Sequence, residues 1–144
     1  MSVSPEPPDC DPYQAELRKR FYWKSLDGDE FEQAFAEVLR KHQFTIVVPP
    51  GSGDGLVDIE VTRNGRKGVV QCKLHVSFVD VRDIYDVLHH YGARFCIIVS
   101  RCGFTRDAYD FRWGKPIYFL DINDLIAMQK GRDVLAEAFT PKET

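Results

Sequence analysis

The sequence VDIEVTRNGRKGVVQCKL, residues 57–74, gives the strongest indication of the fold, because two strand-like segments flank a turn within it. β-Branched and other apolar residues recur in Val57–Arg63 and in Arg66–Leu74, as they do in strands. Asn64-Gly65 separates the two segments, and both residues tolerate the positive φ angles of a type I′ turn. The stretch therefore predicts an antiparallel β-hairpin with a two-residue loop.

The predicted loop fixes which residues of the hairpin lie opposite each other. Asp58 falls opposite Gln71, and Lys73 lies diagonal to Asp58 on the same face, because side chains alternate between the two faces of a strand. The other face carries apolar residues suited to a core, such as Val57 and Ile59. Two interpretations remain open. The polar face is a functional site, or it simply faces water and holds a weak surface ion pair.

The remaining segments alternate between helical and strand patterns. In residues 28–42 apolar side chains recur three and four positions apart, and Gly28 and Asp29 mark the start of the predicted helix. We expect further strands at 44–48, 95–100 and 117–120, and further helices at 81–91, from Thr105 onward, at 122–128 and at 134–139. A hairpin followed by alternating helices and strands predicts an α/β (α+β) fold, with a mixed central sheet flanked by helices.

Length and composition are those of one ordinary globular domain. The 144 residues suffice for a single core, and we expect a disordered or extended leader at 1–12 and one domain over 13–140. The sequence contains neither an apolar run long enough to span a membrane nor a signal-peptide pattern. Its four cysteines form no C-x-x-C pair. These features favour a cytoplasmic protein with no membrane contact.

The charge pattern bears on nucleic-acid binding. A net charge of −3 argues against a protein that holds nucleic acid by overall electrostatics, although an acidic metal site can offset basic patches in an enzyme. One basic cluster is interleaved with aromatic residues and is suited to contact phosphates and stack on bases; it consists of Arg18, Lys19, Arg20 and Lys24. The alternative interpretation is a solvated helix face beside core aromatics.

Three ordered motifs accompany these elements: Phe31-Glu32, GSGDGLVDIEV at 51–61, and Val70-Gln71-Cys72-Lys73. Together they resemble the Mrr-like branch of the PD-(D/E)xK restriction endonuclease-like superfamily, which is known for glutamine where most relatives carry a metal-binding acid. The resemblance extends from Trp23 to about Met128. It implies the restriction endonuclease-like fold with an αβββαβ core.

The resemblance also implies the roles of individual residues. Asp58 is then a metal ligand, together with Gln71 and the backbone carbonyl of Cys72, and Lys73 orients or polarises the attacking water. Glu32 supplies the charge that a glutamine lacks. The implied metal is Mg²⁺, for which Mn²⁺ is expected to substitute, because these ions prefer oxygen ligands. The Asp58 charge favours a protonated Lys73 that acts electrostatically rather than as a neutral base.

The expected function is a Mg²⁺-dependent endonuclease that hydrolyses phosphodiester bonds, with DNA as substrate and a restriction or defence role. Target choice is then expected to come from a homodimer, from a separate targeting or sensor subunit, or from DNA structure. Two other functions remain open. One is a structure-specific, resolvase-like nuclease or an RNA nuclease on the same fold. The other is a catalytically inactive module that binds nucleic acid or protein.

Overall fold

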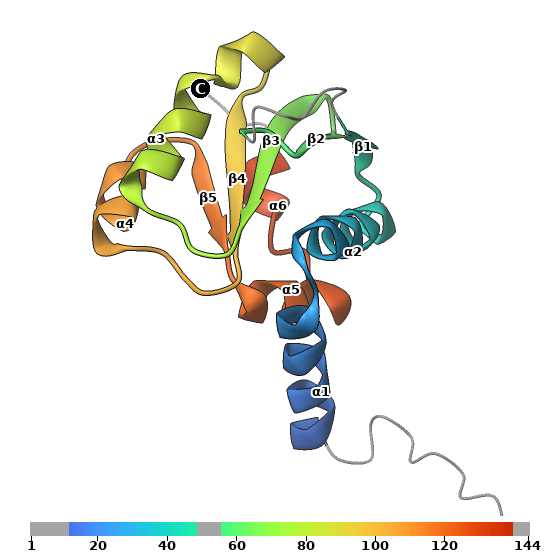
Figure 1. Ribbon diagram of the computed structural model, residues 1–144. Coiled ribbons are helices and arrows are strands. Elements are labelled where there is room, and N and C mark those ends of the chain that lie inside the picture. Colours follow the sequence, from blue (N-terminus) through green and yellow to red (C-terminus); the bar gives the residue numbers. More distant parts are fainter. Residues whose placement is uncertain (1–11, 49–55, 140–144) are drawn as a thin grey trace, which may run out of the picture.

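The central element of the fold is a five-stranded mixed sheet with the order β1-β2-β3-β4-β5 (Figure 1). The computed structural model describes residues 12–48 and 56–139. The strands are β1 (Thr45–Val47), β2 (Ile59–Arg63), β3 (Arg66–Lys73), β4 (Phe95–Ser100) and β5 (Ile117–Leu120). β1, β2 and β3 pair antiparallel, whereas β3, β4 and β5 run parallel. The mixed sheet predicted from the sequence is thereby confirmed.

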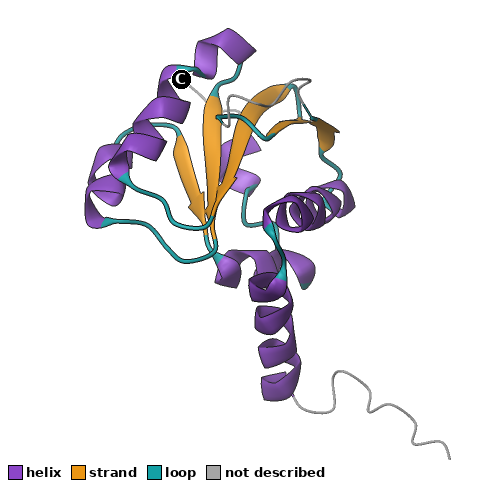
Figure 2. Ribbon diagram, in the orientation of Figure 1, coloured by secondary structure: helices purple, strands orange, loops and turns teal. Residues whose placement is uncertain are grey.

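Helices cover both faces of this sheet (Figure 2). The helices are α1 (Pro12–Ser25), α2 (Gly28–Lys41), α3 (Phe78–Asp86), the 3₁₀ helix η2 (Leu88–Tyr91), α4 (Arg106–Arg112), α5 (Ile122–Gln129) and α6 (Ala136–Phe139). α3, η2 and α4 lie on one face, and α2, α5 and α6 on the other. α1 contacts α5 and projects from the end of the sheet where β4 and β5 finish (Figure 1).

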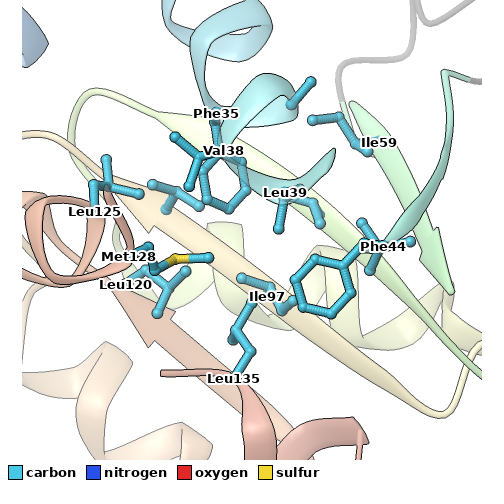
Figure 3. Close-up of a cluster of buried hydrophobic side chains, with 14 of the residues drawn as sticks. Phe35, Val38, Leu39, Phe44, Ile59, Ile97, Leu120, Leu125, Met128 and Leu135 are labelled. Atoms are coloured by element: carbon cyan, nitrogen blue, oxygen red, sulfur yellow. The ribbon is translucent and has the colours of Figure 1, made fainter. Parts of the chain in front are cut away.

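Alternation along the strands sends side chains into two separate cores, one on each face. On the α2 face, Phe35 and Leu39 pack against Ile59, Ile97 and the α5 side chains (Figure 3). On the α3 face, the neighbouring strand residues pack against α3, η2 and α4; they include Val69, Cys96 and Ile98. β3 and β4 are buried on both sides as a result, which is the usual setting of parallel strands.

The hairpin between β2 and β3 has the predicted loop. Asn64 and Gly65 have φ angles of 56° and 73°, as a type I′ turn requires. Arg63 pairs with Arg66, and the pairing continues in register to Ile59 and Val70. The register deduced from the Asn-Gly turn is therefore confirmed for all of β2.

Several element boundaries differ from the expected ones. β2 begins at Ile59 rather than Val57, and the helix expected at 81–91 begins at Phe78 and continues after Asp86 as the 3₁₀ helix η2. α2 begins one residue after Asp27, whose carboxylate accepts from the Glu30 N–H in a capping box, so Asp27 caps the helix rather than Gly28 or Asp29.

Two further expectations concern the ends of the domain. Residues 13–25 lack a clear apolar period, so the sequence does not predict the helix α1 that they form; Trp23 and Ala15 are its buried residues. The expected leader lies, apart from Pro12, outside the described residues, as does the GSGDG stretch at 51–55. None of the helices in the described part of the chain has the length and apolar character that a membrane crossing needs.

Candidate functional site

A β-bulge at the start of β2 determines where the Asp58 side chain points. The Asp58 N–H donates to the Val70 carbonyl at 2.8 Å, while Val70 is already paired with the next residue, Ile59. Two consecutive residues therefore lie opposite one, which is the arrangement of a bulge, and bulges re-aim side chains. Val57, before the bulge, packs in the core on the α3 face, whereas Ile59 packs on the α2 face.

This bulge corrects the face predicted for Asp58. Simple alternation placed Asp58 beside Gln71 and Lys73 and placed Val57 with Ile59. In the structure Asp58 and Ile59 line one hollow on the α2 face, while Val57 lies on the other face. Gln71 and Lys73 alternate with Val70 and so lie on the α3 face. The face prediction is wrong because one extra residue in a strand inverts every position before it.

Asp58 instead lies close to Glu32 of α2. Both line a hollow of about 440 Å³ between α2 and β2. Burial, followed by the nearby carboxylates of Asp58 and Asp29, raises the pKa of Glu32 from 4.5 to about 7. Such a shift arises when like charges are held close together in a partly desolvated site. The structure thus brings together two carboxylates from elements that are separate in the sequence.

The backbone of Cys72 completes this acidic side of the site. Its N–H donates to Asp58 Oδ2 at 2.8 Å, which fixes the carboxylate. The N–H and C=O of one strand residue point toward the same neighbour, so the Cys72 carbonyl also faces the Asp58 side. Burial, and then the charges of Asp58 and Glu32, raise the pKa of the Cys72 thiol, with Arg101 acting in the opposite direction. Cys72 therefore remains a neutral thiol.

The two remaining residues of the Gln-x-Lys motif lie at the same strand end on the α3 face. Gln71 is 3% exposed, so it is not part of a solvated polar surface. The Lys73 side chain is 40% exposed, and its Nζ lies 2.6 Å from Asp80 Oδ1 in the first turn of α3. The end of β3 thus separates a carboxylate side, with Asp58 and Glu32, from a lysine side.

Arg101 is a basic residue at this site that sequence reasoning missed. Its backbone N–H donates to the Lys73 carbonyl at 3.2 Å, directly after β4. Its guanidinium lies 5.1 Å from the centroid of the Phe31 ring and donates to the Leu26 carbonyl. Arg101 thereby brings a positive charge to the acidic side. Arg101 reaches the site because β4 pairs with β3, and no local pattern in the sequence predicts that pairing.

The basic cluster proposed from the sequence lies on α1. Arg18 and Lys24 are exposed, Lys19 is half-buried, and Arg20 forms an ion pair of 3.4 Å with Glu16. The aromatic residues among them differ from one another. Phe21 is 75% exposed, whereas Trp23 is fully buried and donates from Nε1 to Gln129 Oε1 at 3.0 Å. The basic cluster therefore lies on the surface of α1, where Phe21 and Tyr22 are accessible to solvent and Trp23 is part of the core.

The donor atoms can be compared with the needs of a divalent metal ion. Over residues 12–48 and 56–139, no three His, Cys, Asp or Glu side chains gather closely enough to hold a metal ion by themselves. A site for Mg²⁺ requires fewer protein ligands, because this ion keeps several waters and commonly uses one or two carboxylates plus substrate phosphates. Asp58, Glu32 and the Cys72 carbonyl provide oxygen donors of that kind. The donor set fits a hard divalent cation.

Comparisons with solved structures concern the fold. DNA modification-dependent restriction endonuclease AspBHI is similar with a TM-score of 0.60 and 16% identity over 96% of this chain, and the match spans 41% of AspBHI. A crystallised protein of unknown function, AF1548, is similar with a TM-score of 0.55 and 16% identity over 69% of this chain and 66% of its own. This chain therefore matches less than two thirds of either protein. No curated protein sequence matches.

The sequence itself matches a known protein family. The profile of the Mrr_cat family, described as restriction endonuclease, matches residues 23–129. This range contains α2, the β2–β3 hairpin, Glu32, Asp58 and the Gln-x-Lys motif. It agrees with the extent of the resemblance deduced from the motifs, and AspBHI supports the fold independently. The chain belongs to the Mrr_cat restriction endonuclease family.

Proposed function

We propose that this protein is a divalent-metal-dependent endonuclease that hydrolyses phosphodiester bonds in DNA. The observation that carries the proposal is the bulge that turns Asp58 toward Glu32, because it places two carboxylates beside a backbone carbonyl at the end of β3. Burial, followed by the neighbouring Asp58 carboxylate, raises the pKa of Glu32, so the charged form of Glu32 carries a free-energy cost that a bound cation would relieve. Family membership supports a nuclease of restriction type.

In this proposal Asp58, Glu32 and the Cys72 carbonyl hold the metal ion. Mg²⁺ is the ion we propose, with Mn²⁺ as a substitute, and it would neutralise charge on the scissile phosphate and lower the pKa of a bound water. Asp58 is oriented for this role by the Cys72 N–H. Gln71 lies on the Lys73 face, so we now assign it to the lysine side of the site rather than to the metal.

Lys73 has the proposed role of a cation that meets the phosphate from the α3 face. Its Nζ donates a hydrogen bond to Asp80 Oδ1 at 2.6 Å, which holds the side chain at the end of β3. An ammonium fixed near the phosphate stabilises the negative charge that develops on the oxygens during hydrolysis. The lysine also orients the attacking water through one of its N–H groups. Arg101 adds positive charge on the opposite side.

We propose DNA as the substrate, and we assign its first contacts to α1. This helix projects from the end of the sheet where β4 and β5 finish (Figure 1), and it carries the exposed side chains of Arg18, Lys24 and Phe21. Such a mixture supports backbone contact with some stacking on bases. Target selection would come from a second copy of the chain, which double-strand cleavage favours, or from a targeting or sensor subunit.

Cleavage assays test the proposal. Supercoiled plasmid, single-stranded DNA and RNA are incubated with Mg²⁺ or Mn²⁺ and with wild type, Asp58→Ala or Lys73→Ala. We expect the wild type to cut DNA and both variants to lose at least about 100-fold in rate, because each removes a charged group at the reacting centre. Equal residual cleavage in all three proteins would refute the assignment.

The main competing function is a binding module without catalysis. It predicts nucleic-acid binding that survives both substitutions and no cleavage by any of the three proteins. Preferential cleavage of RNA or of branched DNA would instead retain the site and change the substrate class. The same set of assays therefore separates the three functions.

A further inference from the structure

Lys73 is held by a residue that lies outside the family motifs. Its Nζ is 2.6 Å from Oδ1 of Asp80. Lys73 is the last residue of β3, whereas Asp80 lies in the first turn of α3, after the loop that leaves the strand. The Asp80 side chain is 20% exposed and the Lys73 side chain 40%, so the carboxylate is the better shielded partner of this ion pair.

Asp80 is in turn fixed by Ser77, the residue that caps α3. Asp80 Oδ2 accepts from the Ser77 N–H at 2.9 Å and from the Ser77 hydroxyl at 3.0 Å. Partial burial by itself raises the pKa of Asp80, but the hydrogen bonds from Lys73 and Ser77 outweigh it and hold the pKa below 3.8. Asp80 is therefore a charged acceptor with a fixed orientation at neutral pH.

We propose that Asp80 is a positioning residue that acts through Lys73 on the cleavage reaction. This inference rests on the proposed function. An ammonium has three N–H donors, so the bond to Asp80 leaves two of them for a phosphate oxygen and a water. A free lysine side chain has many rotamers, and fixing it beforehand removes the entropic cost of ordering it during the reaction. Asp80 thereby supplies the orientation that the exposed Lys73 side chain lacks.

A pair of substitutions separates the charge of Asp80 from its place in the helix cap. Asp80 occupies the third position of α3, where both Glu and Gln support a capping box behind a serine. Asp80→Glu keeps the negative charge. Asp80→Gln removes the charge with a side chain of the same length as glutamate, so the two variants differ in charge alone. We expect Asp80→Gln to lower kcat by about 10- to 100-fold with little change in KM, and Asp80→Glu to retain most activity.

The matched control is Asp83→Gln. Asp83 lies on the same helix, pairs with Arg82 at 3.2 Å and is more exposed than Asp80, so its replacement should leave kcat unchanged. Both Asp80 variants should remain folded at the assay temperature, with Asp80→Gln somewhat less stable than Asp80→Glu because it lacks the charge that pairs with Lys73. Cleavage by Asp80→Gln as fast as by Asp80→Glu, or faster than by wild type, would overturn the proposal.

A double-mutant cycle tests whether Asp80 acts through Lys73. Single-turnover cleavage of end-labelled DNA is compared for Lys73→Met with and without Asp80→Gln. We expect no further loss in the double variant, because the group that Asp80 positions is already absent. An additional loss equal to that of Asp80→Gln alone would show a structural role and overturn the inference. Wild-type protein that cuts no nucleic acid would overturn the proposed function and the positioning role together, whereas cleavage that needs Lys73 but not Asp80 would overturn the positioning role alone.

Discussion

Replacing Glu32 by glutamine is expected to stabilise the metal-free protein at alkaline pH. Glu32 has a pKa of about 7 in the folded protein, against its usual 4.5, because of burial and the charges of Asp58 and Asp29. Between these two values the folded protein binds more protons than the unfolded chain does. Its stability therefore falls as the pH rises through this window, and the full cost is present above about pH 7. Glutamine resembles the protonated acid and avoids that cost.

The size of the gain follows from the shift. A change from 4.5 to about 7 is about 2.5 units, which corresponds to about 3.4 kcal/mol at about 1.36 kcal/mol per unit. Glu32 is half-buried, so solvent screening reduces this value, and we expect Glu32→Gln to gain roughly 1 to 2 kcal/mol at pH 8. At pH 5 the acid is largely protonated in the folded state and mostly ionised in the unfolded chain, so the gain should fall to roughly a quarter of its value at pH 8.

Chemical denaturation in the presence of a chelator measures this difference. Guanidinium unfolding curves are recorded at pH 5 and pH 8 for wild type, Glu32→Gln and the control Glu37→Gln, whose exposed side chain pairs with Arg40 on the same helix. The control should change by less than about 0.5 kcal/mol at either pH. A Glu32→Gln variant with the same stability relative to wild type at both pH values would refute the reasoning that burial and the neighbouring carboxylates raise the pKa of Glu32.

Two further predictions concern the core and the thiols. Gly68→Ala should destabilise the protein by about 1 to 3 kcal/mol in urea unfolding, because an added Cβ would lie 2.2 Å from an atom of the fully buried Phe95 ring. The control is Gly28→Ala, where no atom lies within 4 Å of the added Cβ. Its stability should change by less than about 1 kcal/mol. Alkylation followed by peptide mass spectrometry at pH 8 should label the exposed Cys102 well before Cys72 and Cys96, since burial raises the pKa of both thiols; equal labelling of Cys102 and Cys72 would contradict the buried, acidic surroundings of Cys72.

The sequence predicts the hairpin well because its signals are local. Asn64-Gly65 specifies the turn, and the turn specifies the register of β2 and β3, as the pairing of Ile59 with Val70 confirms. The strands expected at 95–100 and 117–120 have the predicted bounds, because each is a short apolar run between clear turn or cap residues. The expected position of Asp58 opposite Gln71 is wrong, because the bulge places Asp58 beside Ile59 opposite Val70.

The faces and the partners of the site could not be predicted in the same way. Alternation assumes a regular strand, and the bulge at Asp58 depends on hydrogen bonding to Val70 that no local pattern reveals. Asp80 and Arg101 reach the site through the β3–β4 pairing and the start of α3, so their roles depend on tertiary structure. Glu32 was found through the family resemblance, and its nearness to Asp58 required the packing of α2.

Direct measurement of Mn²⁺ binding tests most closely the claim that the bulge creates a metal site. Free Mn²⁺ is quantified by electron paramagnetic resonance during titration of wild type, Asp58→Asn, Glu32→Gln and the control Asp83→Gln at pH 8; Asp83 lies on α3, away from the hollow between α2 and β2. We expect wild type and control to bind Mn²⁺ equally, Glu32→Gln to bind more weakly, and Asp58→Asn to lose binding at this site. Unchanged binding by Asp58→Asn would contradict the account, because Asp58 would then not be a ligand of the metal.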